Sequence, residues 1–320
     1  MKNKNLFGLI LSISVSYSAT ADNLVLDMGT GSPTGNYLAM GKDINNYCSN
    51  ELSMNINVLE SNGSVDNLLG MLNKKYDLGI VQNDVLYYNA ERSPDKINKN
   101  RVKIISGLHK EAIHLLIPKG YNPDPEKKGL WSDIFVHKDK EPAKKFQLSM
   151  LKDHEVGATG GAIVSAEALS YFFKLNLKIK NTSMSVNDTS IPMVIVGGAP
   201  YEPVKSYLNT GKWMLATLDY DAIAAKAPFY SHQTVNYRID GKIQSISTLG
   251  VRALLIGKSF RNENRNAPMT ELATCIYRNI VDLADDSETN PNWNNVYEHI
   301  EDGDQSDWAY FPLDSTKLAE

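Results

Sequence analysis

The sequence predicts an α/β fold arranged in two lobes, and three observations carry this prediction. Short apolar runs alternate with stretches whose apolar residues recur at helical spacing. Loops rich in glycine and hydroxyl residues follow several of these runs, where a strand would end and a helix begin. The chain also has 320 residues, which favours two lobes over one hydrophobic core. Alternating strands and helices indicate parallel sheets with helices on their faces.

The individual elements follow from apolar spacing along the chain. Buried strands are expected at 24–28, 54–59, 77–81, 102–117, 156–158, 193–196, 213–218 and 249–256. Helices with apolar stripes are expected across 37–47, 65–72, 166–173, 204–208 and 268–283. Ser64 is the expected N-cap of the second helix, because its hydroxyl can accept a bond from a first-turn amide. The stretch 118–145 is rich in Pro, Lys and Asp, which predicts a long polar insertion.

The first 21 residues have the pattern of a cleavable secretory signal. Lys2 and Lys4 precede a short apolar run at 6–15, and 19–21 (Ala-Thr-Ala) has the small-x-small pattern of a cleavage site. The apolar run is too short to cross a bilayer, which takes about 20 apolar residues. We therefore expect residues 1–21 to be removed and the mature chain to be free outside the cytoplasm. Loss of the two lysines takes the formal net charge from −4 to −6, which argues against nucleic acid as a partner.

The two cysteines, Cys48 and Cys275, leave two interpretations open. In an oxidising compartment they can form one disulfide, and otherwise they are two buried thiols. Neither has a neighbouring Cys or His at ligand spacing, and the six histidines are scattered along the chain. We therefore expect no metal site.

No nucleotide-binding or catalytic motif is complete in the sequence. Residues 29–34 contain the first two glycines of G-x-G-x-x-G, but Thr34 stands in the third position. Neither a G-x-x-x-x-G-K-[ST] phosphate loop nor a G-x-S-x-G nucleophile elbow occurs. We therefore expect no cofactor, no catalytic residues and no enzymatic activity.

Four loops at the ends of predicted strands form the candidate binding site. They are 29–35, 61–64, 159–162 and 197–200. Open parallel sheets bind ligands outside the carboxyl ends of their strands, and glycine lets the backbone approach a ligand closely. Unpaired amides at a helix N-terminus favour an anion. One such loop is ordinary turn geometry, but four in equivalent places predict a cleft for a small anion.

The residues expected to contact the ligand come from these loops, from the start of the helix after the first loop, from the end of the third strand and from near the return crossover. They are Thr30, Gly31, Thr34, Gly35, Tyr37, Asn62, Ser64, Gln82, Thr159, Ala162, Gly198 and Tyr230. The residues of the first loop are expected to supply amides and a hydroxyl, with a locally satisfied helix cap as the alternative. Tyr37 is expected either to wall the cleft or to pack in the core.

Charged residues near these positions are weaker candidates. Gln82 is preferred to Asp84, because an exposed carboxylate would repel an anion. Arg238 and Arg252 are candidates for a carboxylate clamp by location only, and solvation at the surface is the simpler interpretation of each.

Three segments resemble the TAXI family of TRAP-transporter solute receptors, and their order and spacing match as well. These segments are 29–37 (GTGSPTGNY), 62–68 (NGSVDNL) and 76–84 (YDLGIVQND). Residues 160–162 with the helix after them, and 197–200, are similar to elements of the second lobe of that family. The resemblance extends over most of the chain beyond its signal.

This resemblance implies a type II periplasmic binding protein, with two α/β lobes joined by two crossover strands. The first lobe would hold 22–108 and 236–320, and the second would hold 109–235 with the polar insertion 118–145. The lobes would close around a small organic anion of the acidic amino acid or dicarboxylate type. The implied protein works as a monomer in the periplasm and delivers its ligand to the membrane permease subunits of a sodium-coupled TRAP-type importer.

The sequence departs from the family in three places. Ser32-Pro33 replaces a glycine-rich centre in the first loop, 157–162 lacks the full Gly-x-Gly-Ser-Gly-Thr run, and the insertion 118–145 is longer than expected. Three other functions stay open: a ligand sensor that feeds a signalling partner, an exported enzyme on the same scaffold, and a surface adhesin.

Overall fold

A computed structural model describes residues 24–121, 146–239, 241–300 and 307–318. The expected signal at 1–21 lies outside the described residues, and so does the expected insertion 118–145 except for its first four positions. No helix within the described ranges combines the length and apolar character that a membrane span requires.

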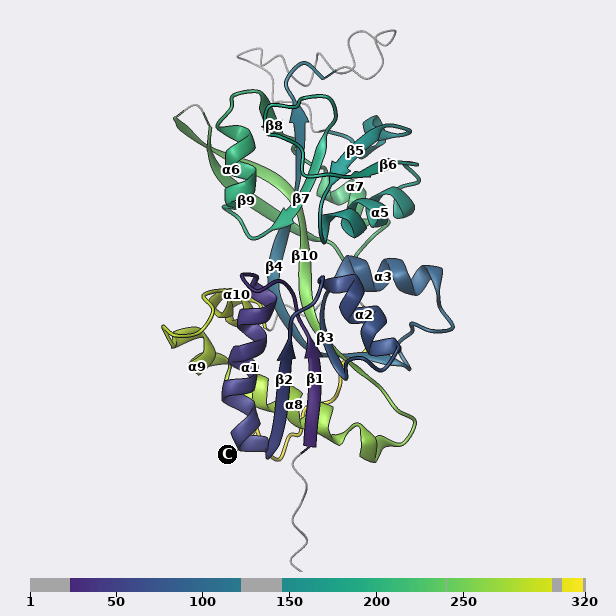
Figure 1. Cartoon of the computed structure of the whole chain (residues 1–320), viewed down its shortest axis with the longest axis vertical. Helices are drawn as coiled ribbons and strands as arrows, with labels where there is room; N and C mark the ends of the chain where they lie inside the picture. The colour runs from purple at the N-terminus through teal and green to yellow at the C-terminus, as the bar shows by residue number, and fades with distance from the viewer. Residues whose placement is uncertain (1–23, 122–145, 240, 301–306, 319–320) are drawn as a thin grey trace, which may run out of the picture.

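The chain builds one lobe, crosses to a second lobe, and returns to complete the first (Figure 1). The first lobe begins with β1 (Leu24–Gly29), α1 (Asn36–Leu52), β2 (Met54–Leu59), α2 (Ser64–Leu72), β3 (Leu78–Gln82) and α3 (Asn83–Arg92). The long strand β4 (Val102–Pro118) leads into the second lobe. After the return through β10 (Lys242–Lys258), the first lobe is completed by η2 (Glu263–Arg265), α8 (Ala267–Arg278), α9 (Ile280–Asp285) and α10 (Asn292–Glu298).

The second lobe contains the elements between the two long strands. They are η1 (Leu148–Leu151), β5 (Glu155–Ala158), α5 (Ala162–Phe172), β6 (Lys178–Asn181), β7 (Met193–Gly197), α6 (Glu202–Leu208), β8 (Trp213–Leu215), α7 (Tyr220–Ala224) and β9 (Ser231–Ile239). β5 pairs in parallel with both β6 and β7, and β7 pairs antiparallel with β4.

The strand order is β2-β1-β3-β10-β4-β7-β5-β6, and it shows how the lobes are joined. β1 is parallel to β2 and β3 in the first lobe, where β10 joins antiparallel to β3. β10 pairs with β9 over 242–250 and with β3 over 253–257, so one strand belongs to both lobes. β4 and β10 also pair antiparallel with each other. Two α/β lobes joined by two crossover strands form the type II periplasmic binding protein fold, which confirms the predicted fold class.

The sheet of the first lobe is covered on both faces, which explains the apolar strands. α1 and α8 pack on one face in a core that includes Met28, Ile44 and Leu272. α2 and α3 cover the other face through Leu68 and Val85. Every residue of β3 is buried, as expected for a strand with helices on both sides.

Several elements of the second lobe depart from the sequence-based expectations. β9 and the first part of β10 were not expected, because their exposed hairpin carries polar residues on one face and few large apolar ones. The strand expected at 213–218 ends at Leu215. The lobe boundaries expected at 108/109 and 235/236 stay predictions, and β9 lies beside the second-lobe part of β10.

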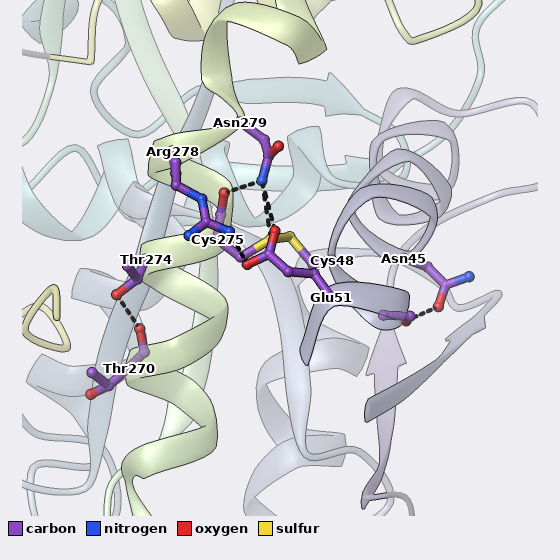
Figure 2. Close-up of a disulfide and its surroundings, with 9 residues drawn as sticks. Asn45, Cys48, Glu51, Thr270, Thr274, Cys275, Arg278 and Asn279 are labelled. Atoms are coloured by element: carbon purple, nitrogen blue, oxygen red, sulfur yellow. Dashed lines mark hydrogen bonds and ion pairs between the residues drawn. A yellow bond between two sulfur atoms is a disulfide. The ribbon is translucent and has the colours of Figure 1, made fainter. Parts of the chain in front are cut away.

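Cys48 and Cys275 form a disulfide, which decides between the two interpretations left open by the sequence. The bond links α1 to α8 inside the first lobe (Figure 2). Around it, Glu51 of α1 pairs with Arg278 of α8 and accepts a hydrogen bond from Asn279 at 3.4 Å. The cross-link therefore ties the N-terminal part of this lobe to the part that returns after the second lobe.

Candidate functional site

A cleft of about 870 Å³ lies between the two lobes. The first lobe contributes residues from the loops after β1 and β2 and from the end of β3. The second lobe contributes the loop after β5, most of β7 and the loop that follows it. Strand β4 adds Glu111 at the point where it passes from one lobe to the other. The cleft therefore lies at the carboxyl ends of strands from both lobes, where open α/β sheets bind ligands.

The structure brings ten of the twelve predicted contact residues together in this cleft. They are Gly31, Thr34, Gly35, Tyr37, Asn62, Ser64, Gln82, Thr159, Ala162 and Gly198. Their contact with a ligand stays a prediction, but their convergence joins five segments that are separate in the sequence.

Thr30 and Tyr230 do not line the cleft. Thr30 is fully buried, and both its amide and its hydroxyl bond to the carbonyl of Leu59, at 3.0 and 2.7 Å. It therefore holds the loop after β1 against the end of β2 and has no donor left for a ligand. Tyr230 is also fully buried, within the apolar core of the second lobe.

The wall formed by the first lobe is held by side chains beneath it. Asn67 of α2 is fully buried and donates to the carbonyls of Thr30 and Ile80, at 2.6 and 2.7 Å. These bonds fix the loop after β1 relative to β3. α1 begins after Gly35 and α2 after Gly63, and neither has a side-chain cap, so first-turn amides at the cleft keep their donors.

Two details of this wall differ from expectation. Gly63 is the N-cap of α2, in place of Ser64, and has a φ of +89°, which glycine adopts without strain. The Ser64 hydroxyl instead accepts a bond from the amide of Gln82 at 3.0 Å. The amide of Gly35 bonds to the carbonyl of Ser32 at 2.9 Å, so it is used within the turn.

The wall formed by the second lobe offers fewer amides than the sequence suggested. The amides of residues 162–165 bond to the carbonyls of 159–161, at 3.2 to 3.5 Å, so Ala162 has no free donor. A Cβ atom at Gly161 would lie 3.2 Å from Oε1 of Gln82 in the other lobe. The lobes therefore approach each other closely at this edge, where glycine leaves room for the Gln82 side chain.

Glu111 is the charged residue among the described cleft residues that the sequence analysis did not predict. Its carboxylate accepts a hydrogen bond from the Tyr37 hydroxyl at 3.1 Å, and its side chain is 14% exposed. Burial raises the pKa of Glu111 to about 7, with the Tyr37 bond opposing the shift and the charge of Asp84 adding to it. The available signal was the polar triplet 109–111 inside the apolar run 102–117, because a buried charge needs a reason.

The other charged candidates lie away from the cleft. Arg252 is buried, in contrast to the expected surface position, and its Nε donates to the carbonyl of Leu108 at 3.1 Å. Arg238 is exposed on β9 and donates to the carbonyl of Gly241. Asp84 is fully buried rather than exposed, so the expected repulsion of an anion at the surface does not apply.

A second group of side chains forms direct contacts between the two lobes. Asn83 of α3 donates to the carbonyl of Phe229 in the second lobe at 2.6 Å. The ring of Tyr87 stacks on that of Phe229 with centroids 4.6 Å apart. The Asp84 carboxylate lies near two hydroxyls of the second lobe. The Ser165 hydroxyl lowers the pKa of Asp84, and the charge of Asp84 adds to the raised pKa of Tyr230. α3 is therefore the part of the first lobe that docks on the second.

No group of three or more His, Cys, Asp or Glu within the described ranges is arranged to hold a metal ion. In that part of the chain, the residues lining the cleft also include no Lys, Arg or His. The polar groups that the described residues present to the cleft are thus backbone amides, hydroxyls, amides of Asn and Gln, and one carboxyl group.

A model of the NMT1-like family matches residues 28–123, from β1 to just beyond β4. No curated protein matches the sequence. Among solved structures, the GluR0 ligand-binding core in complex with L-glutamate is 12% identical, with 81% of this chain and 95% of that chain covered and a TM-score of 0.43. A TctC solute-binding protein from Polaromonas is 13% identical, with 94% and 95% covered and a TM-score of 0.42. A histidine kinase sensor domain with similarity to periplasmic binding proteins is 6% identical, with 87% and 95% covered and a TM-score of 0.45. The fold assignment rests on the strand order and the crossovers of this chain itself.

Proposed function

We propose that this chain is an exported receptor that captures a small solute when its two lobes close. The observation that carries the proposal is the 870 Å³ cleft, which residues of both lobes line and which includes Glu111 of the crossover strand β4. A cleft of this size suits a small organic molecule. Closure about two strands is a hinge motion, in which the ligand is buried by groups from both lobes.

We also propose that the solute carries an anionic group. The N-termini of α1 and α2 open into the cleft without side-chain caps, and such ends favour negative charge. Acidic amino acids and dicarboxylates are the classes that the TAXI resemblance implies. The same resemblance supports a TRAP-type importer as the membrane partner and the periplasm as the compartment, and the match to the NMT1-like model at 28–123 overlaps its most similar segments.

Binding without turnover is part of this proposal. Described residues that line the cleft include several hydroxyls but no His that would serve as a general base for them. A ligand sensor would use the same cleft and the same closure. The partner encoded beside this chain, a permease or a kinase, discriminates between these two roles.

Native mass spectrometry of the protein purified without denaturation tests the proposal directly. We expect a co-purified small molecule that leaves on unfolding, because a closed cleft retains its ligand through purification. Purified protein that carries no solute and binds none from a cell extract would contradict the receptor function.

A cleft-filling substitution then locates the site. A Cβ at Gly198 would meet no atom within 4 Å, so Gly198→Phe should place a ring in the cleft without disturbing the fold. We expect the bound mass to disappear in Gly198→Phe and to persist in the matched control Gly198→Ala, with thermal unfolding of both close to that of the wild type. Retention of the mass by Gly198→Phe would place the solute elsewhere.

A further inference from the structure

Glu111 places a carboxyl group in the cleft, and no cation there balances its charge when it is ionised. It is the only Asp or Glu among the described residues that line the cleft, and none of them is Lys, Arg or His. Its Oε2 accepts the bond from Tyr37, while its Oε1 lies 3.9 Å from Nε2 of His109, which is beyond hydrogen-bond reach. Burial lowers the pKa of His109 to about 4, so this ring is neutral at pH 7 and does not balance the carboxylate.

A carboxylate in this position is suited to a cationic donor. An ionised carboxyl group can accept several hydrogen bonds, and Glu111 accepts one from the described residues. Withdrawal of the charge from water is costly unless an opposite charge or strong donors compensate. The rings of Tyr37 and Tyr201 line the same cleft, and aromatic faces attract cations. An ammonium group of the ligand would supply the missing charge and donors together.

The helix N-termini beside Glu111 favour the opposite charge. α1 and α2 begin at the cleft with uncapped first turns, and Tyr37, which bonds to Glu111, belongs to the first turn of α1. The N-terminus of α1, which favours an anion, and the Glu111 carboxylate, which favours a cation, are thus separated only by the side chain of Tyr37. This arrangement matches a molecule that carries both charges on neighbouring atoms.

We propose that the cleft takes a zwitterionic amino acid, with its ammonium group on Glu111 and its carboxylate at the amide ends of α1 and α2. The inference rests on the receptor function proposed above and narrows its ligand class. A plain dicarboxylate would bring further negative charge to Glu111 with no cation in the described lining to offset it. Glu111 therefore selects amino acids over the corresponding acids that lack the amine.

Calorimetry with matched pairs of ligands tests this selection. The probes are L-glutamate with glutarate, L-glutamine with glutaramate, and L-norvaline with valerate, added to protein freed of bound solute by unfolding and refolding. We expect at least one amino acid to bind and its partner without the amine to bind at least about tenfold more weakly, since a hydrogen bond to a charged group contributes about that factor. Equal binding within every pair would overturn the proposal.

The variant Glu111→Gln removes the charge and keeps the shape. We expect it to lose about tenfold or more in affinity for the amino acid and to bind the partner without the amine unchanged or better. The exposed Glu91→Gln is the matched control and should behave as the wild type. Because Glu111→Gln removes a buried charge, its thermal stability should be equal or higher, so weaker binding is not a loss of fold. If Glu111→Gln keeps the wild-type preference for the amino acid over its partner without the amine, another group binds the ammonium and the proposal is overturned.

Proton release gives an independent readout. The groups facing Glu111 are Tyr37 from α1, His109 on its own strand and Tyr201 of the second lobe, with Asp84 of α3 acting at longer range. None of them is cationic at neutral pH, so an ammonium is the group that would pull the Glu111 pKa down from about 7. We expect protons to be released on binding at pH 6.5, measured in two buffers of different ionisation enthalpy, and no release in Glu111→Gln. Proton uptake by the wild type would mean that neutral Glu111 donates to the ligand, which overturns the proposal.

Failure of this inference can be told from failure of the receptor function. A co-purified solute that lacks an amine would overturn the amino acid proposal and leave the receptor in place. A protein that carries no solute and binds no member of any pair would overturn both.

Discussion

Breaking the disulfide between Cys48 and Cys275 should lower the free energy of unfolding by about 5 kcal/mol, if the entropy of the unfolded chain dominates. The two residues are 227 positions apart, so the bond closes a very long loop in the unfolded chain. In the folded protein it joins α1 to α8 within one lobe (Figure 2). Along the chain, the elements of the second lobe lie between these two helices. Both side chains are fully buried, so the cross-link lies inside the core of that lobe.

Urea unfolding with and without a strong reductant measures this effect in the wild-type chain. The double variant Cys48→Ala/Cys275→Ala supplies the matched control, because reductant should leave its midpoint unchanged. We expect the reduced wild type and the double variant to unfold at similar, much lower urea concentrations than the oxidised protein. Equal midpoints for oxidised and reduced wild type would show that the loop is already constrained in the unfolded state.

The variant Asp84→Asn should be more stable than the wild type above about pH 6, by up to about 3 kcal/mol. Burial raises the pKa of Asp84 from 3.8 to about 6, and the nearby Ser165 hydroxyl and the amide of Val85 oppose the shift. The folded protein therefore holds this proton more tightly than the unfolded chain does. The stability that Asp84 contributes is present below its unfolded pKa and is lost as the pH rises through about 6.

The measurement is the difference in unfolding free energy between Asp84→Asn and wild type, from pH 4 to pH 8. A difference is needed because burial lowers the pKa values of His109 and His114 to about 4, which makes the wild type gain stability with pH over part of the same range. We expect the difference to grow between pH 4 and 6 and then to level off. Asp95→Asn, at an exposed position, should show no such trend. If the difference in unfolding free energy between Asp84→Asn and the wild type does not change with pH, hydrogen-bond donors at the contact between the lobes compensate the charge of Asp84 in the wild type.

Asp84 also bears on lobe closure. Its carboxylate lies in α3, and the hydroxyls of Ser165 and Tyr230 beside it come from the second lobe. Asn83 next to it bonds across to Phe229. The stability change is therefore expected to be concentrated at the contact between the lobes.

The pattern of strands and loops made much of the fold predictable. The strand at 54–59 alternates apolar and polar residues and matches β2 in full, because alternation is set by the two faces of a single strand. The loops after β1, β2, β5 and β7 were expected to meet, since parallel strands present their carboxyl ends at one edge. β9 was not predictable in this way, because it depends on pairing with β10 across a hairpin that faces solvent.

The sequence by itself determined the fold class and the loops that form the cleft, because local apolar spacing and glycine-rich strand ends depend on neighbouring residues along the chain. Only the tertiary structure decided which groups in those loops are free. The Thr30 hydroxyl donates to the carbonyl of Leu59, and the amide of Ala162 donates to the carbonyl of Thr159. Glu111, in contrast, lines the cleft from the crossover strand β4. Whether a donor, an acceptor or a charge is available depends on partners distant in sequence. That is also why the pairing of Cys48 with Cys275 needed the structure: their bond depends on α1 and α8 meeting in space.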